Sequence, residues 1–92
     1  MGKPYVGDIG TKLILDVGTD VSSASVRKIR YSKPDKTKGW WTGAPESDET
    51  ISYIMQDGDF DQAGTYSVQS YIEMSGWSGY GELTSFKVYT PL

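Results

Sequence analysis

Hydrophobic and polar residues alternate along this chain in short runs with a period of two, which is typical of strands that bury one face. The longest run covers residues 65–73, where Tyr66, Val68, Ser70 and Ile72 share one face and Thr65, Ser67, Gln69 and Glu73 share the other. No window of a dozen residues keeps an apolar stripe at helical spacing, and eleven Gly and four Pro interrupt the chain. The pattern predicts a central strand here and little helix.

Weaker alternations predict further strands on both sides of this run. They cover residues 12–17, 26–32, 51–56 and 85–89, although Ile54 breaks the third of them. The segment 33–39 has the Pro, Asp and closing Gly of a hairpin tip, residues 43–49 are expected to form a loop, and 75–81 a Gly-rich connection. We therefore expect one all-β domain over residues 1–92, an immunoglobulin-like antiparallel β-sandwich of six to eight short strands.

Trp40 and Trp41 follow the hairpin tip and begin another extended segment. Neighbours in a strand face opposite sides, so one indole is expected in the core and the other outside or at an edge. The alternation does not say which one is buried. The outer indole is interpreted as a packing residue or as an interface contact.

The charge balance argues against a nucleic-acid partner. The formal net charge is −3, and binding to a phosphate backbone needs clustered Lys and Arg. No apolar run approaches the roughly 20 residues that span a bilayer, so we expect no membrane insertion. There is no Cys, so the core is expected to hold by packing alone or with help from partner chains.

The residues available for chemistry do not favour catalysis. The chain has neither His nor Cys, which removes the commonest general base and the strongest nucleophile. We expect no enzymatic activity, no catalytic residues and no cofactor. Asp57, Asp59 and Asp61 alternate and are oxygen donors suited to Ca²⁺, but the segment lacks the Gly and the bidentate Glu of an EF-hand loop. A polar corner whose acids bind backbone amides or face water is the favoured interpretation, without a metal.

Large aromatic residues in the Gly-rich connection are the strongest candidates for contacts. Trp77 and Tyr80 have small neighbours there and either plug the end of the sandwich or anchor a partner. Together with Trp40 and Trp41 they are the candidate interface residues.

The segment Asp59–Val68 resembles the corner that precedes the sixth strand of immunoglobulin-like domains. In that corner a Tyr hydroxyl ties the start of the strand to the preceding turn, and Tyr66 is the matching residue. Val68 stands where antibody domains carry a Cys, so aliphatic packing is expected in its place.

A wider resemblance rests on four segments, Val6–Thr11, Arg30–Asp35, Gln56–Tyr66 and Trp77–Glu82. They look like a family of small phage and prophage proteins that is similar to the N-terminal sandwich domain of phage baseplate upper proteins. The resemblance implies an immunoglobulin-like fold and a place in the virion or tail. It brings no catalytic motif.

We therefore expect a structural or adaptor component of a bacteriophage or prophage particle, in the tail, baseplate or capsid surface. Its expected partners are other virion proteins or copies of itself, and it is expected to be made in the host bacterial cytoplasm and to act in the virion. The alternative is a module that binds a carbohydrate on the host surface, with Trp and Tyr as stacking platforms.

Overall fold

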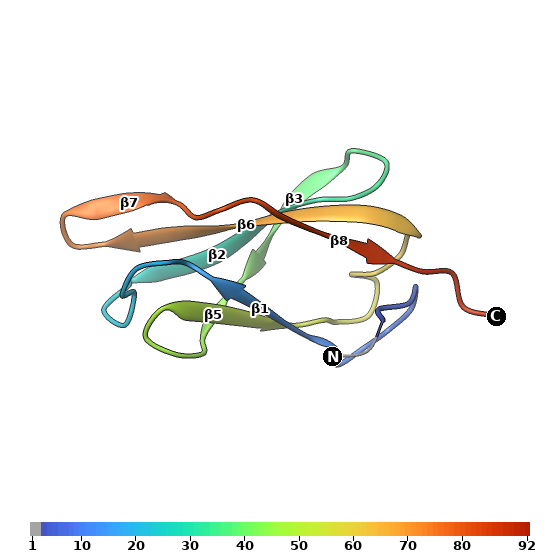
Figure 1. Ribbon diagram of the computed structural model, residues 1–92, viewed down its shortest axis with the longest axis horizontal. Helices are drawn as coiled ribbons and strands as arrows, with labels where there is room; N and C mark the ends of the chain where they lie inside the picture. The colour runs from blue at the N-terminus through green and yellow to red at the C-terminus, as the bar shows by residue number, and fades with distance from the viewer. Residues whose placement is uncertain (1–2) are drawn as a thin grey trace.

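The computed structural model describes residues 3–92, which form eight β-strands and no helix (Figure 1). The strands are β1 (Lys12–Asp16), β2 (Val26–Ser32), β3 (Lys38–Thr42), β4 (Ala44–Pro45), β5 (Thr50–Ile54), β6 (Gly64–Met74), β7 (Trp77–Tyr80) and β8 (Thr84–Val88). Within these residues there is thus no helix with the length and apolar character needed to cross a membrane. Residues 1 and 2, which belong to the domain expected over 1–92, lie outside the described part of the chain.

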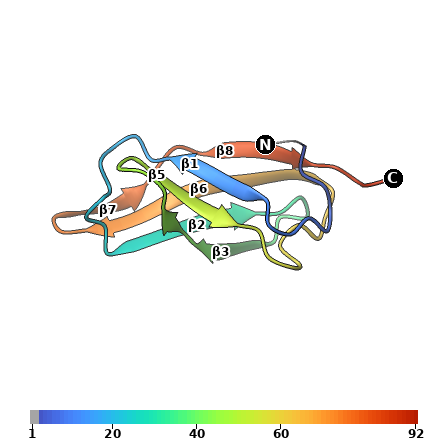
Figure 2. The same cartoon turned by 90° about the horizontal axis from the view of Figure 1, so that it is seen from below.

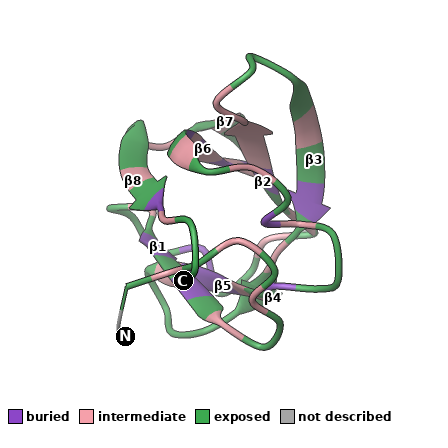
Figure 3. Ribbon diagram, turned by 90° about the vertical axis from the view of Figure 1, so that its right-hand side faces the viewer, coloured by how far each residue is buried: buried purple, intermediate pink, exposed green. Residues whose placement is uncertain are grey.

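The strands form two antiparallel sheets that pack face to face (Figures 1 and 3). One sheet has the order β1-β5-β4, and the other begins with the order β3-β2-β6. The edge of β6 opposite β2 pairs with β8 along residues 64–68 and with β7 along residues 71–74. This is the strand order of an immunoglobulin-like sandwich, with B-E-D in one sheet and C′-C-F-G in the other. The predicted all-β sandwich is therefore confirmed.

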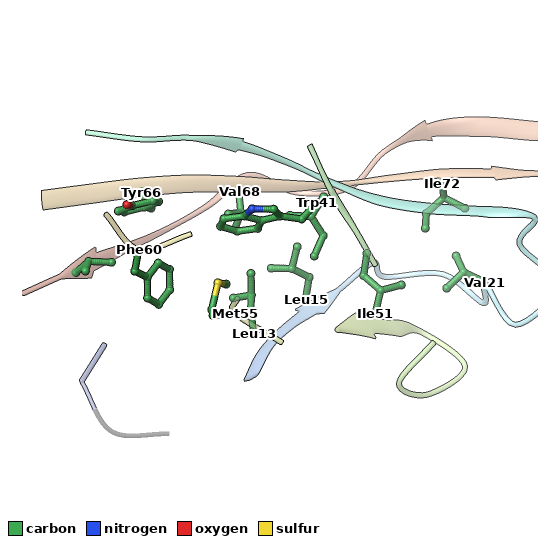
Figure 4. Packing of buried hydrophobic residues seen from close by; sticks show 12 residues of the cluster. Leu13, Leu15, Val21, Trp41, Ile51, Met55, Phe60, Tyr66, Val68 and Ile72 are labelled. Carbon is green, nitrogen blue, oxygen red and sulfur yellow. The ribbon is translucent and has the colours of Figure 1, made fainter. Parts of the chain in front are cut away.

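The core lies between the sheets and comes from the inward residues of each alternation (Figure 4). Strand β6 contributes most to it, because Tyr66, Val68 and Ile72 are fully buried. The other members come from both sheets and their connections: Leu13, Leu15, Val21, Ile29, Trp41, Ile51, Met55, Phe60 and Val88. Since the chain has no disulfide, this packing is the main term that holds the sheets together.

The corner before β6 has the geometry that its sequence predicts. The Tyr66 hydroxyl accepts a hydrogen bond from the Gln62 N–H at 3.3 Å and donates one to the Asp59 carbonyl at 3.4 Å. Burial raises the pKa of Tyr66. Both partners of the hydroxyl are main-chain groups of the corner.

Three expectations about local structure are corrected. Residues 77–80 form strand β7, although Gly and Ser on the predicted connection indicated a loop, because the β6 ladder continues into a tight hairpin. Residues 44 and 45 of the expected loop form the short strand β4. Gly39 does not close the hairpin tip but lies in β3, and the residue with positive φ in that turn is Lys36.

Removal of the corner hydroxyl tests its contribution to stability. We expect Tyr66→Phe to lower the free energy of unfolding by about 1–2 kcal/mol, because two partly buried main-chain groups lose their partner. Urea denaturation provides the measurement. Tyr5→Phe is the matched control, since the side chain of Tyr5 is half exposed and makes no hydrogen bond to residues 3–92. Equal unfolding midpoints for the two variants would contradict a structural role for the corner hydroxyl.

Candidate functional site

Three aromatic side chains gather on the outer face of the larger sheet, the face turned away from the core. Trp40 comes from β3, Tyr71 from β6 and Tyr80 from β7. Their ring centroids lie 5.8 Å apart for Trp40 and Tyr71, 6.5 Å for Trp40 and Tyr80, and 5.0 Å for Tyr71 and Tyr80. We call these three residues the aromatic platform.

Strand register explains why residues from three strands meet there. Tyr71 and Tyr80 are directly opposite each other across the β6–β7 ladder, so their rings are adjacent on one face. Trp40 is opposite Arg30 on β2, and its indole reaches past β2 to both tyrosines. The platform therefore draws its rings from strands at both edges of the order β3-β2-β6-β7 and from β6 between them; Figure 2 shows these strands.

Cationic groups lie against the indole of the platform. The Arg30 guanidinium is 4.9 Å from the Trp40 ring centroid, and the Lys28 ammonium is 5.8 Å from it. Both distances fall in the range of cation–π attraction, which favours the position of the indole next to these two β2 side chains. On the other side the Tyr71 hydroxyl donates to the Glu73 carboxylate at 2.9 Å, and this hydrogen bond raises the pKa of Tyr71.

A shallow cavity of about 300 Å³ opens beside the platform. Its lining includes the apolar ring of Tyr80 and the side chain of Leu83, together with groups that donate or accept hydrogen bonds: Arg30, Ser32, Lys38, Ser67 and Gln69. Two of these residues are cations and none is an acid, although the whole chain is acidic. A surface with rings, cations and hydroxyls side by side is suited to binding and offers no converging acid–base pair.

The two adjacent tryptophans divide between this surface and the core. Trp41 is 5% exposed and packs between the rings of Tyr31 and Tyr53, at centroid distances of 4.4 and 5.0 Å. Trp40 is 44% exposed. The expected split is confirmed, and Trp41 is excluded from the candidate surface because its indole is enclosed by other rings.

Trp77 and Tyr80 lie on opposite faces of the β6–β7 hairpin, whereas the sequence suggested a shared loop tip. Tyr80 is 54% exposed and belongs to the platform, while Trp77 is 39% exposed and folds over Gly79. The hairpin projects beyond the other strands (Figure 1). Neither ring plugs the end of the sandwich, and Trp77 stays a predicted contact residue separate from the platform.

Two of the three acids of the corner, Asp59 and Asp61, bind protein groups, while Asp57 is exposed. Asp59 accepts from the Gln56 N–H and the Tyr53 hydroxyl, both at 2.7 Å, and burial together with this bond raises the pKa of Tyr53. Asp61 forms an ion pair with Lys33 at 2.8 Å. Across residues 3–92 no three potential metal ligands converge. Asp59 thus serves the corner in the way that the favoured interpretation predicts.

Tyr71 of the platform and Arg30 beside its indole were not singled out by sequence reasoning. Each lies on the polar face of its strand, where an isolated Tyr or Arg is ordinary. Their partners become visible only when the register of β2, β6 and β7 is known. The only signal in the sequence for Tyr71 was its position on the polar face of the long alternation over residues 65–73.

Comparison with protein-family models, with curated proteins and with solved structures gave no match.

Alanine substitution of the adjacent tryptophans separates core from surface. We expect Trp41→Ala to lower the free energy of unfolding by about 3–5 kcal/mol, because it leaves a cavity in the ring stack. Trp40→Ala is expected to cost about 1 kcal/mol or less, since it removes an exposed ring and its cation contacts. Thermal or urea unfolding measures both. A larger loss for Trp40→Ala would show that the platform is structural.

Proposed function

We propose that this chain is a non-enzymatic structural or adaptor component of a bacteriophage or prophage particle, which acts through protein contacts on the outer face of the larger sheet. The observation that carries the binding role is the aromatic platform, whose exposed Trp40 and Tyr80 lie beside a polar cavity. The sequence resemblance to small phage proteins supports the place in a particle.

The physical properties of the platform suit a protein contact. Trp, Tyr and Arg dominate the energetics of many interfaces, since they offer large rigid areas with a polar end. Here Trp40, Tyr80 and Arg30 lie together on strands and not on a mobile loop. The rings are therefore held in place before a partner arrives, which reduces the entropy cost of binding.

A small domain without disulfides also gains from assembly. Any partner that binds only the folded state stabilises it by mass action. The chain has 92 residues and no Cys, so bound neighbours would add to the stability that its small core provides.

Assembly of particles with variant chains tests the proposal. We expect the double variant Trp40→Ala/Tyr80→Ala to reduce the copies per purified particle at least about tenfold, because the centre of the contact is lost. Mass spectrometry of particles from the phage or induced prophage that encodes the chain gives the copy number. Tyr5→Ala is the control, since Tyr5 is an exposed ring outside the platform. Absence of the wild-type chain from purified particles would overturn the particle role.

A second candidate function is recognition of a host-surface carbohydrate, and the cavity is the observation that favours it. Sugar rings stack on Trp and Tyr, and the cavity places Arg30, Lys38, Ser67 and Gln69 within reach of hydroxyl or carboxylate groups next to Tyr80.

A glycan array that includes neutral and anionic polysaccharides tests this second function. The carbohydrate role predicts retention of the wild-type chain that Trp40→Ala/Tyr80→Ala abolishes and that Tyr5→Ala leaves unchanged. The change is expected because the rings supply the stacking surface. No retention on any glycan would remove this candidate and leave the protein-contact proposal standing.

A further inference from the structure

Strand β1 forms an open edge of the smaller sheet. In the order β1-β5-β4 it pairs only with β5, and the N-terminal segment runs to the other sheet, where Tyr5 bridges Tyr89. The opposite edge of the smaller sheet, β4, is only two residues long and contains Pro45, two features that block pairing with another strand. Strand β1 has five residues and no such protection.

The ladder between β1 and β5 fixes which backbone groups point to the open side. Hydrogen bonds from the Val17 N–H to the Glu49 carbonyl and from the Met55 N–H to the Thr11 carbonyl lie at its two ends. Because hydrogen-bonded and non-hydrogen-bonded pairs alternate in an antiparallel ladder, Leu13 and Leu15 bond to β5. The N–H and C=O groups of Lys12, Ile14 and Asp16 consequently face outward. Among residues 3–92 no other group hydrogen-bonds to them.

The sequence of β1 is complementary to itself when it is reversed. An antiparallel copy centred on Ile14 places Lys12 opposite Asp16 of the second copy, Leu13 opposite Leu15, and Ile14 opposite Ile14. Lys12, Ile14 and Asp16, whose backbone groups are free, would form the hydrogen-bonded pairs between the copies. The register that satisfies these backbone groups is therefore also the one that pairs the opposite charges. A shift by one residue would place the outward backbone groups out of phase, and a shift by two would leave Lys12 and Asp16 without opposite charges.

The side chains of the open edge fit this arrangement. Ile14 is 51% exposed at the centre of the strand, where an edge that avoids pairing would carry a Lys or a Pro. Ile54 on the neighbouring β5 is also exposed on this face, so pairing would extend a small apolar patch across the two-fold axis. Lys12 already pairs with Glu46 at 2.7 Å, with a side chain that is still 45% exposed.

We propose that two copies of this chain associate through β1, in an antiparallel pairing centred on Ile14 that joins the two smaller sheets into one continuous sheet. This dimer is isologous, as expected for a two-fold interface. The dimer uses a different surface from the aromatic platform. Evidence against the dimer would therefore leave the proposed binding function intact, and evidence against the binding function would leave the dimer proposal intact.

Sedimentation velocity over about 10 µM to 1 mM tests the proposal, a range chosen because a strand-edge contact is small. The wild-type chain is expected to pass from monomer to dimer. Asp16→Lys and Lys12→Asp each turn two attractive pairs per dimer into repulsive ones, and each is expected to weaken dimerisation at least about tenfold. An equimolar mixture of the two variants is expected to recover the dimer, because both pairs become complementary between unlike copies.

Two measurements keep the result interpretable. Circular dichroism shows whether each variant keeps its fold, and Trp40→Ala is the control for association through the platform. Amide hydrogen exchange of Ile14 is expected to slow as the concentration of the wild-type chain rises. A chain that stays monomeric to about 1 mM overturns the proposal, as does a dimer that Trp40→Ala breaks and Asp16→Lys leaves unchanged.

Discussion

The alternation of side chains along β6 is the constraint on which the rest of this structure depends. In one strand of 11 residues it sends Tyr66, Val68 and Ile72 into the core and leaves Tyr71 on the opposite face. Because β6 pairs with β2 on one side and with β7 and β8 on the other, its register fixes the direction of every neighbouring side chain. The core and the aromatic platform are therefore two faces of the same ladder.

The platform is held by the fold and not by the rings alone. The hairpin that carries Trp40 is tied to the corner of Tyr66 by the Lys33–Asp61 ion pair and by the Asp35 N–H, which donates to the Gln62 Oε1 at 3.1 Å. On the inner side Trp41 anchors the same strand in a stack of rings. One tryptophan thus fixes the strand in the core while its neighbour is exposed on the outer face of the sheet.

Much of the fold could be predicted from the sequence, and less of the site. Strand β2 and the corner of Tyr66 follow from alternation and turn chemistry, which are local. Strand β7 was missed because Gly and Ser have weak strand preference and form a strand here only through pairing with β6. The choice between Trp40 and Trp41 needed the β2–β3 register, which places Trp41 opposite the buried Ile29. In the same way, the place of Tyr71 in the platform could be recognised only from the β6–β7 register, which puts it opposite Tyr80.

We propose that Trp40 and Tyr80 contact a partner, and hydroxyl-radical footprinting read by mass spectrometry tests this contact. The oxidation of each ring is compared between the free chain and the chain in assembled particles, with Tyr5 as the internal reference outside the platform. We expect Trp40 and Tyr80 to become protected on assembly while Tyr5 reacts as before. Equal reactivity of Trp40 and Tyr80 in the free and the assembled chain would contradict it.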